Sequence, residues 1–244
     1  MWQACLLILA KLISSIGTRP KLAVLVVVTI ATTLAGVFVL VPRTYSTEAG
    51  EWRTVTLTDS TVVRLGPRTR IIVSFDTEKR LIRQVGNEAT YQVAKDPNRP
   101  LFVKAGVATV QAIGTKFGVS SDSETIVVTV AEGIVSVSRH SARPDHLSPP
   151  DSVRAEAGQQ VLVDLWTPLS AQQVNVDVAL AWERGRIVFQ GTPIPEAISQ
   201  YNRRHKRQIP IPPRSSHSSL VFGEFDLENP DKFIEYLEKM TGPN

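Results

Sequence analysis

The chain has 244 residues, of which 43% are hydrophobic, and its formal net charge is +4. This composition supports a buried core and excludes general disorder. The first 42 residues carry Lys11, Arg19 and Lys21 and no acid, which leaves +1 for all that follows. A body this close to neutral lacks the basic face that nucleic-acid binding requires, so we expect no nucleic-acid partner. Cys5 is the single cysteine, so no disulfide is expected.

The run 22–41, LAVLVVVTIATTLAGVFVLV, carries no charge. Twenty residues of helix span about 30 Å, the thickness of a bilayer core, so the sequence predicts one transmembrane helix. The basic residues before it favour a short cytoplasmic N-terminus, residues 1–21, and an exported body. A signal peptide cleaved near Ala35 and a buried core helix are the alternatives. The apolar run continues past Ala35 to Val41, which favours an anchor.

The segment 45–165 contains short β-branched runs, each bounded by turn residues. The spacing of these runs predicts an all-β domain, and it leaves a sandwich, a barrel and a solenoid open. The predicted strands are 54–58, 61–65, 70–75, 81–85, 89–93, 101–105, 108–113, 116–119, 125–130, 134–138 and 158–163. A polar, proline-rich stretch from 140 to 152 is expected to be a loop, and 166–181 a linker.

Several ordered motifs in this segment resemble the FecR protein family. They are Thr54-Val-Thr-Leu-Thr-Asp-Ser60, Glu88-Ala with Tyr91, Arg99-Pro-Leu-Phe-Val103, Gly114-Thr-Lys-Phe117 and Glu132-Gly-Ile-Val-Ser-Val137. Ser60 stands where the family usually has glycine, and Tyr91 ends a block that Asn87 lengthens. The resemblance implies a periplasmic domain of a transmembrane sigma-factor regulator. Proteins of this kind usually carry a cytoplasmic region that binds the sigma factor, and only 21 residues precede the predicted span here.

The segment 182–244 predicts a small α+β module in the order strand, helix, strand, strand, helix. Thr192 and Pro193 are expected to begin the first helix, as its N-cap and first helical residue. Its apolar face is predicted to comprise Ile194, Ala197, Ile198 and Tyr201, which recur at helical spacing. A short strand is predicted over 208–211, and a second helix after Pro230, with Phe233, Leu237 and Met240 on its apolar face. This module resembles the secretin and TonB-receptor short N-terminal domain. The partner-contact candidates are Gln200, Arg203, Arg204 and Glu224.

No sequence pattern indicates catalysis, so the protein is expected to be no enzyme. The four histidines lack metal-ligand spacing, and no phosphate loop or dinucleotide motif is present. We expect neither a metal nor another cofactor. Isolated acids at predicted turns, such as Asp76, Glu88 and Asp96, have no partner that the sequence identifies.

The resemblance implies an inner-membrane protein of a Gram-negative bacterium. It would relay the signal of a TonB-dependent outer-membrane receptor, through that receptor's periplasmic signalling domain, to an extracytoplasmic-function sigma factor of the iron-uptake type. The polar stretch Thr44–Gly50 would then be an accessible zone for regulated proteolysis. The alternative is a periplasmic envelope adaptor or binding protein without sigma-factor control.

Overall fold

The computed structural model describes residues 42–122, 124–139, 151–211 and 218–241. The predicted span therefore lies outside the described residues. Among the helices that are described, none is long and apolar enough to cross a bilayer. Residues 43–244 form one compact unit, and its architecture is mainly β, as predicted.

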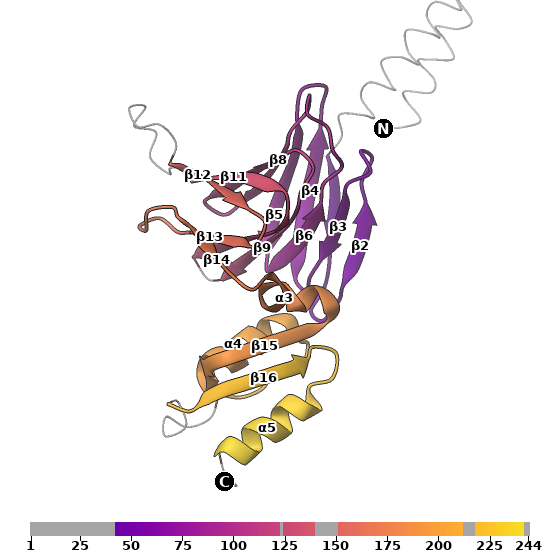
Figure 1. The fold of residues 1–244 in the computed structure, drawn as a ribbon. Helices are drawn as coiled ribbons and strands as arrows, with labels where there is room; N and C mark the ends of the chain where they lie inside the picture. The colour runs from indigo at the N-terminus through magenta and orange to yellow at the C-terminus, as the bar shows by residue number, and fades with distance from the viewer. Residues whose placement is uncertain (1–41, 123, 140–150, 212–217, 242–244) are drawn as a thin grey trace, which may run out of the picture. The chain divides into compact units, whose positions relative to one another are not determined.

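Two seven-stranded sheets make up most of this unit (Figure 1). Sheet A contains, in spatial order, β1 (Arg43–Ser46), β4 (Thr69–Phe75), β5 (Arg80–Gly86), β7 (Leu101–Ala105), β8 (Ala108–Ala112), β11 (Ile134–Arg139) and β12 (Ser152–Glu156). Sheet B contains β14 (Ala171–Gln173), β13 (Gln159–Val163), β10 (Thr125–Glu132), β9 (Lys116–Asp122), β6 (Glu88–Gln92), β3 (Val62–Leu65) and β2 (Arg53–Thr56). All strand pairs are antiparallel except β5 with β7.

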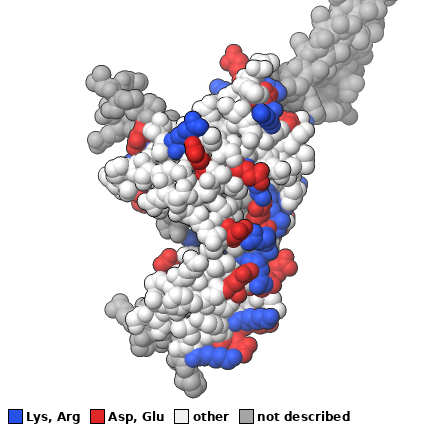
Figure 2. All heavy atoms as spheres, viewed as in Figure 1, with Lys and Arg blue, Asp and Glu red and all other residues white. Residues whose placement is uncertain are grey.

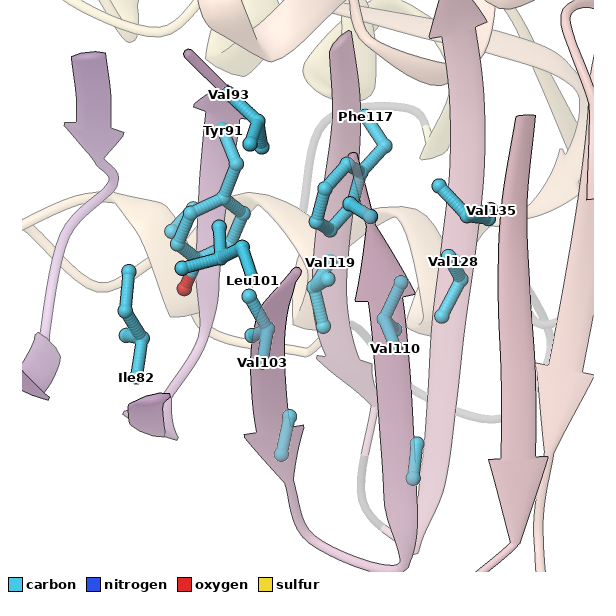
Figure 3. Close-up of a cluster of buried hydrophobic side chains, with 14 of the residues drawn as sticks. Ile82, Tyr91, Val93, Leu101, Val103, Val110, Phe117, Val119, Val128 and Val135 are labelled. Atoms are coloured by element: carbon cyan, nitrogen blue, oxygen red, sulfur yellow. The ribbon is translucent and has the colours of Figure 1, made fainter. Parts of the chain in front are cut away.

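The two sheets face each other across one hydrophobic core, so the fold is a β-sandwich (Figure 3). Alternate residues of each strand point inward, as in β4, where Ile71 and Val73 are buried and Arg70 is exposed. Tyr91 and Phe117 lie side by side on neighbouring strands of sheet B, with ring centroids 5.2 Å apart. The Tyr91 hydroxyl donates to Gln84 of sheet A at 2.8 Å, and Gln84 donates to the Val119 carbonyl of sheet B at 3.1 Å. The sheets are thus joined by hydrogen bonds as well as by apolar contact.

Three short strands were not predicted. They are β1, β12 and β14, and β14 lies in the segment expected to be a linker. Part of that segment also forms the short helix α3 (Val176–Ala179), so 166–181 is not an unstructured connection.

Strand β1 limits the expected accessible zone over Thr44–Gly50 in its first four residues, whereas Glu48 and Gly50 are exposed. Thr44 and Ser46 pair with β4, and Thr47 is buried. The Thr47 hydroxyl donates to the Gly66 carbonyl at 2.6 Å and accepts from the Thr69 amide at 3.0 Å. Residues 44–47 would have to leave the sheet before a protease could bind them in extended form.

A tight hairpin between β2 and β3 explains the Asp59-Ser60 motif. The Leu57 amide donates to the Thr61 carbonyl at 2.8 Å, and Asp59 accepts from the Thr61 amide and hydroxyl. Ser60 has φ of 70°, the left-handed conformation that commonly closes a three-residue hairpin loop and that glycine adopts without strain.

Ser60→Gly is therefore expected to stabilise the protein by about 1 kcal/mol, because it removes the steric cost of a left-handed side chain. Denaturant unfolding would measure this gain. Ser74→Gly is the control, since Ser74 lies in β4, where glycine should destabilise the strand. A loss of stability in Ser60→Gly would contradict the interpretation of this hairpin.

The C-terminal module, defined here as residues 186–241, contains β15 (Arg186–Pro193), α4 (Ile194–Arg204), β16 (Leu220–Asp226) and α5 (Asp231–Thr241). The 3₁₀-helix η1 (Ala181–Arg184) precedes it. Strands β15 and β16 pair antiparallel, and both helices pack against them. Its core includes a cluster of aromatic rings. The ring centroid of Phe233 lies 4.8 Å from that of Tyr201, 4.8 Å from that of Phe225 and 5.5 Å from that of Phe189.

Several details of this module differ from the prediction. Thr192 and Pro193 end β15, and α4 begins at Ile194 with Pro195 in its first turn. The predicted strand over 208–211 is absent from the described chain. The Ile209 amide and carbonyl instead bind the Asn202 side chain, each at 2.8 Å. The predicted inward face of α4 is confirmed, since Ile194, Ala197, Ile198 and Tyr201 are all buried.

In the second helix, the predicted apolar face is confirmed only in part. Phe233 and Leu237 are buried, whereas Met240 is exposed.

Tyr201 gives the module a testable pH dependence. Its hydroxyl donates to the Asp226 carbonyl at 2.8 Å, and burial raises its pKa to about 12, with smaller contributions from Asp226 and Asp231. An unfolded tyrosine ionises near pH 10, so the unfolded chain loses this proton first. Stability from Tyr201 is therefore complete below about pH 10 and declines as the pH rises toward 12.

Tyr201→Phe should lose some stability at neutral pH, yet its stability should decline less than that of the native chain between pH 10 and 12. Denaturant unfolding across this range would give the slope of the unfolding free energy against pH for each protein. The two slopes should differ by an amount that corresponds to at most one bound proton. Equal slopes in both proteins would show that burial does not raise the pKa of Tyr201.

Candidate partner-binding surface

A cleft lies between α4 of the C-terminal module and the outer face of sheet B. It has a volume of about 250 Å³. Its lining is mostly polar and comprises Asn87, Glu88, Ser120, Ser121, Val127, Gln160, Gln200, Arg203 and Arg204. We call these nine residues the α4 cleft.

A buried ion pair closes one side of the α4 cleft. The Arg204 guanidinium donates to both oxygens of Glu88, from Nε at 2.8 Å and from Nη2 at 2.6 Å. The Glu88 side chain is only 1% exposed and that of Arg204 13%. A carboxylate in this position needs a paired cation, because desolvation without one is costly. The pair therefore ties α4 to the first residue of β6.

Glycine makes room for this pair. A Cβ atom on Gly66 would lie 2.5 Å from Cγ of Glu88 and 3.2 Å from its backbone carbonyl. Next to the pair, the Asn87 side chain donates to the Arg203 carbonyl at 2.8 Å and to the Pro67 carbonyl at 3.1 Å. Backbone and side chain thus hold the end of α4 on the same turn of the sandwich.

A second set of contacts joins the sandwich to the segment that leads into the module. Trp52 and Trp182 stack with centroids 5.9 Å apart, and the Arg64 guanidinium lies 5.8 Å from the Trp52 ring. Leu180 fits over Gly118 of β9, where a Cβ atom would come within 2.6 Å of its Cδ2. Trp52 follows β1 along the chain, so these contacts connect η1 with the start of the sandwich.

Residues 43–136 match the model of the FecR protein family. The chain carries a FecR domain. This match confirms the resemblance stated from the sequence motifs, and it places β1 to the first half of β11 within the FecR domain. No curated protein matches the chain.

Two crystal structures of a candidate anti-sigma factor from Parabacteroides distasonis ATCC 8503 are similar to the chain. At 2.50 Å resolution, the TM-score is 0.69, the identity 26%, and the match covers 83% of this chain and 92% of the other. At 1.65 Å, the corresponding values are 0.68, 26%, 82% and 92%. The similarity thus extends well beyond the FecR domain. Together with the family match, it supports a regulatory role, and the family is not typically enzymatic.

The structure places three of the four predicted contact residues together. Gln200, Arg203 and Arg204 line the α4 cleft, whereas Glu224 lies on β16 and pairs with Arg186 at 2.7 Å. Arg204 is engaged within the chain by Glu88, and Gln200 donates to Glu196 at 3.1 Å. Contact of these four residues with a partner stays a prediction.

Sequence reasoning assigned Glu88 to the isolated acids at turns and missed its role in the cleft. Asp76 and Asp96 do lie in turns, where each accepts hydrogen bonds from backbone amides two and three residues ahead. For Asp76 these bonds are the main reason why its pKa is lowered. For Asp96 burial raises the pKa, but the hydrogen bond and charge of Arg99, together with the two amides, outweigh it and leave the pKa lowered. Among the described residues, no group of three or more His, Cys, Asp or Glu side chains could hold a metal ion.

Figure 2 shows how charge is distributed over one face of the molecule. Basic and acidic side chains are interleaved there, across the FecR domain and the C-terminal module alike. This face has no continuous basic patch of the kind that binds a nucleic-acid backbone.

Proposed function

We propose that this protein is a single-pass inner-membrane regulator with a cytoplasmic N-terminus and a periplasmic body. It would relay the signal of a TonB-dependent outer-membrane receptor across the periplasm to an extracytoplasmic-function sigma factor of the iron-uptake type. The observation that carries this proposal is the FecR match combined with a candidate anti-sigma factor that covers 83% of the chain.

The C-terminal module is the part that we expect to contact the receptor's periplasmic signalling domain. Its predicted likeness to the secretin and TonB-receptor short N-terminal domain suggests pairing between domains of one kind. Gln200 and Arg203 are half-buried at the mouth of the α4 cleft, where a docked partner would reach them.

The contacts of the module with the FecR domain provide a physical basis for the relay. The Glu88–Arg204 pair joins the module to β6, and the Trp52–Trp182 stack joins η1, which precedes the module, to the segment between β1 and β2. A partner that moved the module would have to break or carry along these contacts. The displacement would then act on the strand nearest the predicted span.

A pull-down of the full chain with the signalling domains of the cognate receptors tests the proposal. Binding should occur with one of them and should weaken in Gln200→Ala/Arg203→Ala. Glu78→Ala is a matched control because Glu78 is exposed in the turn between β4 and β5, away from the module. A complete lack of binding would count against receptor signalling.

The sigma-factor half of the proposal needs its own experiment. Deletion of the gene should change transcription from a promoter that depends on the cognate sigma factor. Receptor binding with unchanged transcription would instead indicate the envelope adaptor named above.

A further inference from the structure

The outer face of sheet A carries three basic residues on adjacent strands. Arg70, Arg83 and Lys104 are exposed on the adjacent strands β4, β5 and β7. Among the described residues, no carboxylate forms an ion pair with any of them, and all the ion pairs found there involve other residues. We call these three residues the basic face.

The placement of these charges opposes folding. Arg83 and Lys104 are direct neighbours in the β5–β7 register, and Arg70 pairs with Val85 two residues along β5. Like charges opposite each other on neighbouring strands are destabilising unless an anion lies between them. A groove of about 340 Å³ runs beside the pair, lined also by Val85, Gly106 and Thr109. The arrangement therefore suits an external anion.

The register of sheet A brings this pair close to the point where the chain enters the sheet. Thr44 pairs with Ile72, Ile72 with Arg83, and Arg83 with Lys104, so all four form one row. Neighbouring strands lie about 4.8 Å apart, which puts Arg83 about 10 Å and Lys104 about 14 Å from Thr44. Thr44 follows the last residue of the predicted span, Val41, by three residues, or at most about 10 Å of extended chain.

Sheet A is also the sheet whose described outer face stays uncovered. The outer face of sheet B lies against η1 and α4, through Gly118 and Glu88. On sheet A, Val85 is 57% exposed beside the basic face. Basic side chains mixed with exposed apolar ones are typical of surfaces that lie at a membrane interface.

We propose that the basic face of sheet A docks on the anionic headgroups of the membrane from which the chain emerges. This inference rests on the membrane anchor in the proposed function. It places sheet A toward the bilayer and the C-terminal module, on the opposite side of the sandwich, toward the periplasm. Lipid phosphates would supply the negative charge that the basic face lacks.

A fluorescent probe on the full chain in nanodiscs tests this docking. The probe is attached through Ser74→Cys in a Cys5→Ser background, because Ser74 is exposed on the same face of sheet A. Headgroup-linked quenchers should reduce its fluorescence in discs that contain phosphatidylglycerol, and less so in discs of phosphatidylcholine. A probe attached through Lys232→Cys on α5 should not be quenched in either.

Charge variants identify the residues. A basic residue near an anionic surface contributes about 1 kcal/mol, so Arg83→Gln/Lys104→Gln should reduce the docking equilibrium about 30-fold. Arg83→Glu/Lys104→Glu should abolish quenching, and Lys206→Glu/Lys232→Glu, which changes the net charge equally at exposed sites, should not. Raising the salt concentration to 0.5 M, a value about threefold above physiological ionic strength, should weaken quenching in the native chain.

Equal quenching in neutral and anionic discs would overturn the proposal, as would quenching that survives Arg83→Glu/Lys104→Glu. Protection of the probe that appears only when an acidic protein is added would also overturn it, because the occupant would then be a protein. No receptor or sigma factor enters the experiment. The nanodisc assay can therefore show no docking while the pull-down shows receptor binding, or docking without receptor binding, so failure of one proposal is distinguishable from failure of the other.

Discussion

Replacing Arg204 by methionine is expected to lower the free energy of unfolding by about 3–5 kcal/mol. The substitution keeps most of the apolar stem but leaves Glu88, which is 1% exposed, without its cation. Thermal or denaturant unfolding would measure the loss. Receptor binding, if it depends on the position of α4, should weaken in the same variant.

The double variant Glu88→Gln/Arg204→Met separates a lost attraction from a stranded charge. It should be more stable than Arg204→Met alone, because no ionised carboxylate is then left buried. Arg207→Met is the matched control. Its partner Asp231 lies 3.5 Å away, and both side chains are more than 60% exposed, so the loss should stay within about 1 kcal/mol. Equal losses in Arg204→Met and Arg207→Met would mean that the Glu88 pair does not hold the module.

The strands that sequence analysis predicted are those with an apolar inner face. Each predicted run from 54–58 to 158–163 corresponds to a strand of the sandwich, within a few residues at either end. Alternating apolar residues can be recognised without knowledge of the partner strand. The three strands that were missed, β1, β12 and β14, all lie at sheet edges and are short and polar. Edge strands are commonly of this kind, because an apolar exposed edge invites aggregation.

The choice among sandwich, barrel and solenoid depended on contacts that local sequence does not encode. The parallel β5–β7 pair and the separation of consecutive strands into two sheets are examples. In helix α4, too, local sequence determined one feature and tertiary contacts determined another. Its buried face followed from residue spacing, whereas its start was predicted at Thr192 because a threonine followed by proline usually begins a helix. Pairing with β16 keeps Thr192 and Pro193 in a strand instead.

The cleft was predictable only on one side. Gln200, Arg203 and Arg204 follow from the polar side of a helix, which any amphipathic pattern reveals. The place of Glu88 in the cleft could not be predicted, because its burial depends on Arg204, 116 residues away, and on the space left by Gly66. A glutamate just before a predicted strand carries no local sign that its side chain will be buried.

A comparable loss, about 3–5 kcal/mol, is expected when Arg80 is replaced by methionine. Arg80 is the largest fully buried side chain of the FecR domain, and its Nη1 donates to Asp59 at 2.7 Å and to the Ala94 carbonyl at 3.0 Å. Its Nε donates to the Arg99 carbonyl at 2.8 Å. One guanidinium thus joins the β2–β3 hairpin to the loop between β6 and β7. Unfolding by denaturant would measure the effect on the whole domain.

The matched control for this site is Arg99→Met, which removes an ion pair with Asp96 whose side chains are 41% and 26% exposed. It should cost about 1 kcal/mol or less, because water already screens that pair. Arg80→Met/Asp59→Asn should regain part of the stability lost in Arg80→Met, since asparagine needs no buried cation. The regain should be incomplete, because Asp59 also accepts the amide and hydroxyl hydrogens of Thr61. An Arg80→Met protein as stable as Arg99→Met would show that apolar packing, and not this ion pair, holds the hairpin in place.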